Sequence, residues 1–537
     1  MLPLFASAQQ SKFFIRFTDK NGSSYSISNP SAFLSARSIQ RRTNQSIAVT
    51  EQDIPVNQSY IDGVVALGAT VFTRSKWFNG ITIQCDSSIL NSILALPYVQ
   101  NFNRVLKTGG SRHPKKPETI LPVSHRIQYP DETNSLDYGG SFNQIHLMHG
   151  EFLHDQGDLG EGKVIALLDA GFNGVDVNPD FDTLRNASHI LGTWDFVANE
   201  SSVYEDDTHG MEVLSTIAGN VPGQLVGTAP HVSVWLLRTE DTGSENLIEE
   251  YNWEAGAEYA DSVGADLISS SLGYTQFDDT TLSHTYADMN GHTCPASIAA
   301  NIATEKGILV LVSAGNSGDS PWHNIGSPAD ADSALAVGAV DSSGNFIFFS
   351  SYGPSSDGDV KPNVAAKGFE TSIGVPGGGV TQGNGTSFAC PVLAGSAACL
   401  WQAHPEKTNM EIYNAIEESA NYFTTPTDTM GYGIPNFQIA DFLLSTPVIE
   451  FQNKDQLLGV YPNPVNDFVS VRYYSSKFET LNIEIVNVIG EKILEKNEIV
   501  SPGNISNINI KLPDLSSGIY LLHLIGETSD YSVKLVR

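Results

Sequence analysis

KVIALLDAGF, residues 163–172, is an apolar run that ends on a single carboxylate, Asp169. A short run without polar alternation is typical of a strand buried on both faces of a parallel sheet. Similar runs follow at 232–238, 265–271, 308–316 and 334–340, and helical patterns separate them at 208–219 and 296–307. The alternation predicts repeated βαβ units over residues 139–445. The expected fold is α/β, a three-layer sandwich in which helices cover both faces of a mainly parallel sheet.

The length and composition of the chain limit the classes of protein to which it can belong. At 537 residues it exceeds what one hydrophobic core supports, so several domains are expected. The composition, 41% hydrophobic with 47 Gly and 26 Pro, is that of a folded, loop-rich protein. No apolar run reaches the roughly 18 residues of a membrane-spanning helix. Only four cysteines occur, at 85, 294, 390 and 399, and without a CxxC pair their spacing indicates neither a disulfide framework nor a zinc site.

Charge is abundant and unevenly distributed. The chain has 29 Lys and Arg against 60 Asp and Glu, a net charge of −31, which argues against nucleic acid as a partner. Residues 9–110 hold 10 basic and 5 acidic side chains, whereas residues 111–454 hold 12 basic and 45 acidic ones. This asymmetry predicts two modules of opposite sign.

Three N-terminal segments precede the α/β region. Residues 1–8, MLPLFASA, end in a small-x-small pattern and are interpreted as the remnant of a secretory signal peptide, with an ordinary N-terminus as the alternative. Residues 9–106 combine strand-like runs such as FFIRF with amphipathic helical stretches and predict a small α/β unit. Residues 107–138 collect Pro, Lys, Ser and Gly without apolar periodicity, as expected of a cleavable linker.

The C-terminal segment has a different pattern. Residues 455–537 contain alternating runs such as FVSVRYY and LNIEIVNV, separated by Gly, Pro, Asn and Ser turns. Period-two alternation with such turns predicts a small β-sandwich.

Two candidate catalytic residues lie at predicted element boundaries. Asp169 ends a strand, where a carboxylate can accept a hydrogen bond from an imidazole, although strand-end Asp residues are also common in turns. His209 precedes Gly210 and a helix of small and apolar residues, so it can face a site. The alternatives are a helix cap and a metal site with Asp206 and Asp207, and the cap is the stronger of the two because no further His or Cys is near.

Two further candidates follow. Ser387 opens a helix in GNGTSFACP, where the free N–H groups and the helix dipole favour a developing oxyanion. A helix cap is the alternative, but Pro391 argues against an ordinary cap because it removes an N–H within the helix. Asn316 ends the run ILVLVSAGN and can donate its amide to the same oxyanion, or merely form a turn. Each residue alone is weak evidence for a catalytic site. The four motifs, however, follow one another along the chain in the order Asp, His, Asn, Ser, and each lies at the end of a predicted strand or the start of a predicted helix.

These motifs resemble a known family. LLDAG, THGMEV, SAGNSG and GTSFACP are similar to those of the subtilisin-like serine peptidases, and the resemblance covers residues 139–445. It implies that Asp169 orients the base, His209 takes the proton, Ser387 attacks and Asn316 helps to hold the oxyanion. The substrate backbone would dock against five further residues: Ser271, Leu272, Gly273, Ala314 and Gly315. The implied reaction is hydrolysis of a peptide bond through an acyl-enzyme.

The sequence departs from the family pattern at three places. Cys390 stands where Ala is usual, Phe388 where Met is commonest, and Asn363 where the family has an Asp. Cys390 is interpreted as a packed thiol and not as a second nucleophile.

The resemblance also implies roles for the flanking segments. Residues 9–106 occupy the place of a prodomain, which would be the enzyme's own inhibitor, and the maturation site is expected within 107–138. A permanent accessory domain is the alternative. Residues 455–537 resemble the C-terminal sorting domains of type IX secretion cargo, with a substrate-binding sandwich as the alternative. That resemblance implies the secretion machinery as a partner, and a protein secreted or held at the outer-membrane surface of a Gram-negative bacterium.

The function expected is that of a secreted serine endopeptidase made as a zymogen and acting on proteins or peptides. No cofactor is required; calcium is possible because of the acidic surface, although no calcium-loop motif is present. A catalytically silent fold used as a surface scaffold is the alternative. A serine esterase of the α/β-hydrolase class is disfavoured because no G-x-S-x-G elbow surrounds Ser387. Specificity is expected to depend on residues 322–330.

Overall fold

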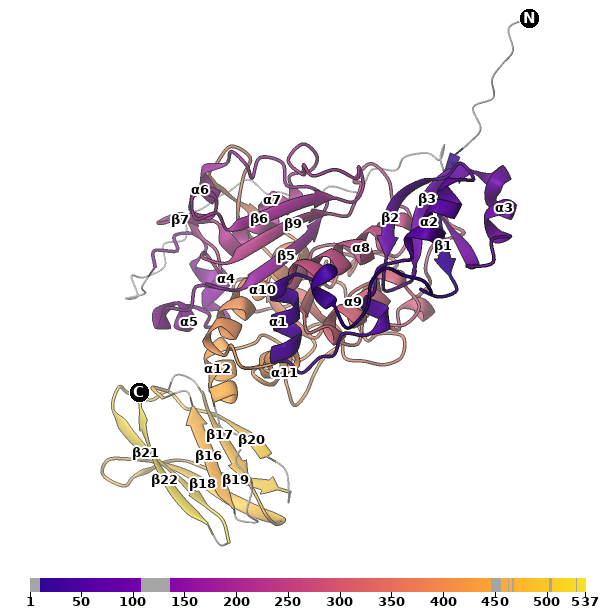
Figure 1. Cartoon of the computed structure of the whole chain (residues 1–537). Helices are drawn as coiled ribbons and strands as arrows, with labels where there is room; N and C mark the ends of the chain where they lie inside the picture. Colours follow the sequence, from indigo (N-terminus) through magenta and orange to yellow (C-terminus); the bar gives the residue numbers. More distant parts are fainter. Residues whose placement is uncertain are drawn as a thin grey trace, which may run out of the picture. The chain divides into compact units, whose positions relative to one another are not determined.

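The structure is a computed structural model that describes residues 10–107, 136–445 and 455–537, except 462, 466, 467, 502–504 and 528. It forms two compact units, residues 1–437 and 438–537, which we treat separately (Figure 1). The expected signal remnant and most of the expected linker lie outside the described residues.

The first unit begins with a four-stranded antiparallel sheet in the order β2-β3-β1-β4. Its strands are β1 (Gln10–Phe17), β2 (Thr70–Ser75), β3 (Gly80–Asp86) and β4 (Val99–Leu106), and its helices are α1 (Ala36–Asn44), α2 (Gln58–Val65) and α3 (Leu90–Leu94). Alternation along β1 sends Phe13, Ile15 and Phe17 into the core of this small α/β domain. Phe14 points the other way and joins the core of the following domain.

A seven-stranded sheet forms the centre of that larger domain. Its order is β13-β12-β11-β10-β5-β9-β6, and every neighbouring pair is parallel. The strands are β5 (Val164–Asp169), β6 (Ile190–Asp195), β9 (Ser233–Arg238), β10 (Leu267–Ser270), β11 (Leu309–Ser313), β12 (Leu335–Val340) and β13 (Val364–Lys367). Because the strands are parallel, their carboxyl ends meet at one edge, where α/β proteins bind ligands.

Helices cover both faces of this sheet, as the sequence pattern predicts. They are α4 (Phe142–His146), α5 (Glu151–Gln156), α6 (Asp182–Asn186), α7 (His209–Ala218), α8 (Ile248–Val263), α9 (Pro295–Glu305), α10 (Thr386–Ala403) and α11 (Asn409–Glu418). Helices α7 and α10 pack together, and α8 and α9 form a second pair. Two small hairpins, β7-β8 (Asn220–Val221, Leu225–Val226) and β14-β15 (Thr371–Gly374, Val380–Gly383), complete the domain.

The N-terminal domain packs on helix α8 of the larger domain (Figure 1). The Phe14 ring stacks on Tyr251 at a centroid distance of 4.5 Å, and Trp77 and Phe78 join the same apolar cluster. Aromatic contacts of this kind bury large areas and dominate interface energetics. The N-terminal domain therefore keeps its own core and also contributes aromatic side chains to the core of the larger domain.

The second unit consists of α12 (Phe437–Ser445), which begins at the last residue of the first unit, and two antiparallel sheets. The sheets have the orders β16-β17-β20 and β19-β18-β21-β22. Their strands are β16 (Gln456–Tyr461), β17 (Phe468–Tyr474), β18 (Glu479–Asn487), β19 (Lys492–Val500), β20 (Ile505–Lys511), β21 (Ile519–Ile525) and β22 (Asp530–Val536). Inward residues of both sheets, such as Val469 and Ile483, share one core, so the predicted β-sandwich is confirmed.

No helix among the described residues is both long enough and apolar enough to cross a membrane.

Candidate active site

An open cleft of about 580 Å³ lies at the carboxyl edge of the parallel sheet. Eight of the nine site residues expected from the sequence line it: His209, Ser271, Leu272, Gly273, Ala314, Gly315, Asn316 and Ser387. The ninth, Asp169, is buried behind His209, with 1% of its side chain exposed. Strand ends and helix starts far apart in the sequence thus converge on one place.

Asp169 and His209 form a direct hydrogen bond. Asp169 is the last residue of β5, His209 is the first of α7, and Oδ1 of the carboxylate lies 2.6 Å from Nδ1 of the imidazole. Oδ1 also accepts from the N–H of Ala170 at 2.7 Å. This contact fixes the ring orientation and places the proton on Nδ1, so Nε2 is the atom that can exchange a proton in the cleft.

Local packing holds His209 against that strand. The carboxylate of Asp207 accepts from the N–H of His209 at 2.8 Å, which satisfies a donor of the first helical turn. Gly210 lies so close to the chain that an added Cβ would stand 2.4 Å from the carbonyl oxygen of Gly171. Only glycine lets α7 approach β5 closely enough for the Asp169 contact.

Ser387 is the second residue of α10 and is 4% exposed. Helix α10 continues through Pro391, which has no N–H to donate to the carbonyl of Ser387 four residues earlier. The hydroxyl of Ser271 donates to that carbonyl instead, at 2.8 Å. Pro391 is recognisable as unusual from the sequence, but no local pattern predicts the compensating hydroxyl of Ser271, which directly follows β10.

Asn316 is oriented by Thr386, the first residue of α10. Its Oδ1 accepts from the backbone N–H of Thr386 at 2.9 Å and from the Thr386 hydroxyl at 3.0 Å. The preceding Gly315 has φ of 102°, a conformation that favours glycine and turns the chain toward α10. With its oxygen used in this way, the amide NH2 of Asn316 is the end that can donate to a ligand.

Other residues complete the cleft. Trp322, Asn324 and Gly326 lie in the segment 322–330 that the sequence suggested for specificity. Ten further lining residues were not expected from the sequence: Ala170, Asp207, Thr208, Glu212, Glu240, Thr242, Thr275, Ser313, Ser317 and Ser351. Glu240 was within reach of the same rule that selected Asp169, because it follows the carboxyl end of β9.

Comparison with known proteins agrees with this geometry. Residues 160–434 match the model of the Subtilase family, which is just over half of the chain. The chain belongs to the subtilase family. It is therefore a subtilisin-like serine peptidase by family, and the resemblance stated from the motifs is confirmed.

Curated subtilases are similar over most of their length. Subtilisin NAT of Bacillus subtilis subsp. natto is 33% identical over 348 residues, covering 64% of this chain and 81% of the relative. Subtilisin of Bacillus pumilus is 33% identical over 311 residues, covering 57% and 98%. Subtilisin Savinase of Lederbergia lenta is 31% identical over 291 residues, covering 53% and 93%.

The flanking domains of this subtilase also match known families. Residues 12–118 match the Peptidase S8 propeptide domain of Bacteroidota, and residues 459–537 match the secretion system C-terminal sorting domain. The protein is thus an exported subtilase with a propeptide and a type IX sorting tail. The exact domain boundaries and the signal peptide remain predictions.

Two departures from the subtilase pattern have structural explanations. Cys390 is fully buried, and burial raises the pKa of its thiol to about 12, which disfavours the reactive thiolate. Asn363 donates its amide to Glu417 at 2.8 Å and to the hydroxyl of Tyr413 at 2.9 Å. A carboxylate at 363 would instead repel Glu417, so the amide suits this interior. Phe388 is buried beside His209, with ring centroids 6.2 Å apart.

Two groups of side chains among the described residues could hold a metal ion. One contains Glu250, His284 and Cys294, and the other contains Asp332, Asp357 and Asp359. The three aspartates supply the oxygen donors that calcium prefers, but all three are exposed. Exposed carboxylates are common on so acidic a chain, so they do not by themselves define a calcium site.

Proposed function

We propose that this subtilase is a secreted serine endopeptidase, made as a zymogen, in which Asp169, His209 and Ser387 form the catalytic triad. The observation that supports the proposal most strongly is the 2.6 Å contact between Asp169 and His209 beside a cleft that also contains Ser387. A buried carboxylate, an oriented imidazole and a serine at a helix start are the parts required for acyl transfer.

The reaction proceeds in two halves. His209 Nε2 takes the Ser387 proton as Oγ attacks the substrate carbonyl carbon, and Asp169 stabilises the imidazolium that forms. The carbonyl oxygen becomes an oxyanion that accepts from the Asn316 amide and from the N–H of Ser387 at the positive end of α10. The C–N bond then breaks, the leaving amine takes the proton from His209, and water hydrolyses the ester in the same manner.

The substrate chain would lie between two walls. Ser271, Leu272 and Gly273 follow β10, and Ala314 and Gly315 follow β11. Backbone groups beyond adjacent strands can pair with an extended peptide, as in other cases of strand addition. The cleft is also lined by three acidic side chains, Asp207, Glu212 and Glu240, which can attract basic residues of a substrate. Cleavage specificity should therefore be measured on peptides with basic residues as well as on peptides with apolar ones.

The propeptide domain is proposed to inhibit and later leave the enzyme. It docks on α8 through the aromatic cluster around Phe14 and through buried ion pairs, among them Arg42 with Asp261 at 2.8 Å. Charge complementarity of this kind matches the opposite signs expected from the sequence. Cleavage is proposed within residues 107–138.

The final location follows from the sorting domain. We propose that the type IX tail carries the protein across the outer membrane of a Gram-negative bacterium, where it is released or held at the surface. The secretion machinery and protein or peptide substrates are the partners. Calcium has no place in the proposed steps.

Ser387→Ala tests the catalytic proposal. The purified, processed protein should hydrolyse casein, lose that activity to phenylmethylsulfonyl fluoride and label at Ser387 with a fluorophosphonate probe. Ser387→Ala should abolish both labelling and hydrolysis. Absence of labelling and of cleavage in the processed, unsubstituted protein would instead favour a catalytically silent surface scaffold.

A further inference from the structure

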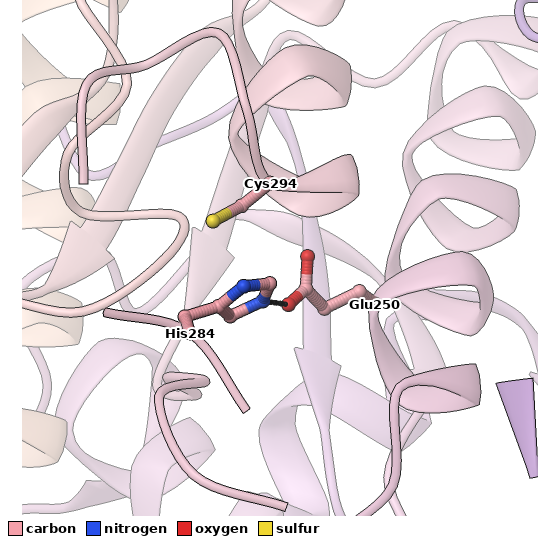
Figure 2. A group of neighbouring side chains, drawn as sticks. All are labelled: Glu250, His284 and Cys294. Carbon is pink, nitrogen blue, oxygen red and sulfur yellow. Dashed lines mark hydrogen bonds and ion pairs between the residues drawn. The ribbon is translucent and has the colours of Figure 1, made fainter. Parts of the chain in front are cut away.

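A carboxylate, an imidazole and a thiol, all of which can bind metal ions, lie together beside helices α8 and α9, outside the proposed triad (Figure 2). Glu250 comes from the first turn of α8, His284 from the loop between β10 and α9, and Cys294 directly precedes α9. All ligand atoms lie within 4.8 Å of one another. Glu250 and Cys294 are fully buried, and 11% of the His284 side chain is exposed.

Two of the three side chains have strong hydrogen bonds, and the third has weak ones. His284 Nε2 and Glu250 Oε1 are paired, as the dashed line in Figure 2 shows, and Glu250 Oε2 accepts from the N–H of Ala296 at 3.1 Å. The Cys294 thiol donates to the carbonyl oxygen of Asp288 at 3.5 Å and also interacts with the side chain of Ser327. A thiol is a weak donor, so these contacts are weak, and its sulfur lies beside a carboxylate and an imidazole.

The surroundings favour a cation. The carboxylates of Asp288 and Asp330 interact electrostatically with both His284 and Cys294, and Glu250 adds a third acidic group. Lys361 faces Asp330, where its Nζ is held by the carbonyl oxygens of Ala331 and Ala334. Acidic groups therefore outnumber basic ones around the cluster.

We propose that Glu250, His284 and Cys294 bind one divalent transition-metal ion of the zinc class. Thiolate, imidazole and carboxylate are the donors zinc uses in proteins, whereas calcium and magnesium prefer oxygen alone. Zinc bonds of about 2.0 to 2.3 Å place ligand atoms about 3.3 to 3.8 Å apart in a tetrahedron, so modest side-chain shifts suffice. Metal binding opens the hydrogen bond between the His284 imidazole and the Glu250 carboxylate. The proton of that bond and the proton of the Cys294 thiol are released to water.

The ion would stiffen one wall of the cleft. The backbone N–H of His284 donates to the carbonyl oxygen of Thr275 at 2.8 Å, and Thr275 lines the cleft. Tyr274 pairs through its backbone with Ser327, next to the lining residue Gly326. An ion held by Glu250 of α8, His284 of the loop and Cys294 at the start of α9 ties this loop to both helices, and takes no part in the chemical steps.

Sequence spacing did not reveal this cluster. Cysteine patterns signal zinc when ligands lie a few residues apart, but His284 and Cys294 are ten residues apart, and Glu250 joins them only through the packing of α8 against α9. The inference is independent of the proposed catalytic roles because its test uses an inactive chain.

The test measures metal binding by the full-length Ser387→Ala protein, which removes self-cleavage from the experiment. After chelation and reloading, we expect about one zinc per chain, and Cys294→Ser should weaken zinc binding by at least about 100-fold. Cobalt in place of zinc should give a thiolate-to-cobalt charge-transfer band that Cys294→Ser removes. Cys85→Ser, which alters another buried cysteine, is the matched control and should keep both properties.

Three results would overturn the proposal: no stoichiometric zinc, equal zinc affinity in Cys294→Ser, or bound cobalt without a thiolate band. Should Cys294→Ser fail to fold, the cobalt spectrum of the chain with Cys294 intact decides alone. Glu250→Gln provides a second variant. The amide has nearly the same shape as the carboxylate, so the interior stays packed, but it is a poorer ligand and should weaken zinc binding.

Discussion

The hydroxyl of Ser271 donates to the backbone carbonyl of Ser387 at 2.8 Å, which joins the end of β10 to the proposed nucleophile. Pro391 makes this contact necessary because it cannot supply the helical N–H. Ser271→Ala should therefore leave a buried carbonyl unpaired and lower the free energy of unfolding by about 1 to 3 kcal/mol. It should also lower kcat/KM, because Ser387 is less firmly positioned.

Ser269→Ala is the matched control for this prediction. Ser269 is buried on β10, two residues before Ser271, and among the described residues its hydroxyl contacts the Cys390 sulfur at 3.9 Å and no backbone carbonyl. Urea denaturation and steady-state kinetics of both variants check the idea. Equal effects of the two substitutions would show that the Ser271 contact has no special role.

Asn316 and Thr386 give a second prediction, on the oxyanion site. Asn316→Ala should lower kcat by about 100-fold to 1000-fold with little change in KM, because the amide acts only when the oxyanion forms. Thr386→Val removes the hydroxyl that holds Asn316 Oδ1 and should lower kcat by about 10-fold, since the backbone N–H remains.

Thr386→Ser is the informative control because it restores a hydroxyl and should recover most of kcat. Steady-state kinetics on one peptide substrate separate kcat from KM. A rise in KM at unchanged kcat in Thr386→Val would place the effect in substrate binding and contradict the assigned role.

Much of this fold could be predicted from the sequence because its signals are local. The buried runs at 164–169 and 308–313 specify strands by composition alone, and Gly and small residues mark where His209 and Ser387 start their helices. Strand ends in a parallel sheet necessarily share an edge, so the order of the motifs was sufficient to assemble the candidate site.

Other features depend on contacts between distant segments and could not be predicted. The pairing of Ser271 with Ser387 requires the register of β10 against α10, and the cluster at Cys294 requires two helices to pack. No local pattern encodes such distances. The same holds for the propeptide ion pairs, since the sequence showed opposite charges but not which residues meet.

Glu254 gives a prediction on pH. Its side chain on α8 is buried under the propeptide, where the Ser75 hydroxyl lies 2.7 Å from it and 3.0 Å from Glu258. Burial, and then repulsion from Glu258, raises the pKa of Glu254 well above its ordinary value. Two backbone N–H groups, from Lys76 and Trp77, donate to Glu258, so the proton resides on Glu254.

A raised pKa in the folded zymogen means that this stability is present at low pH and is lost as pH rises through the raised value. Full-length Ser387→Ala should thus become less stable as pH rises above the ordinary pKa of a glutamate, and Glu254→Gln should flatten that decline. Denaturation curves of both proteins, recorded from acid to alkaline pH, measure the free energy of unfolding at each pH. Glu305→Gln, at an exposed carboxylate, is the control, and parallel profiles for Glu254→Gln and its parent would refute the assignment.

Asp261 gives the last prediction, on propeptide docking. It is fully buried on α8, and its partners are three propeptide cations: Arg41 at 2.6 Å, Arg42 at 2.8 Å and Lys76 at 3.0 Å. Burial alone would raise the pKa of Asp261, but attraction to these cations holds it well below its ordinary value. Its stabilisation is therefore present at neutral pH and is lost as strong acid protonates the carboxylate.

Asp261→Asn should leave buried cations without a counter-charge and destabilise the zymogen by about 3 to 5 kcal/mol. The processed enzyme should be little affected, because all three ion-pair partners belong to the propeptide. Asp279→Asn is the matched control: it breaks the more exposed ion pair with Arg104 across the same interface and should cost less than about 1 kcal/mol. Urea denaturation of the zymogen and of the processed form compares them, and equal destabilisation of both forms would place the role of Asp261 within the catalytic domain instead.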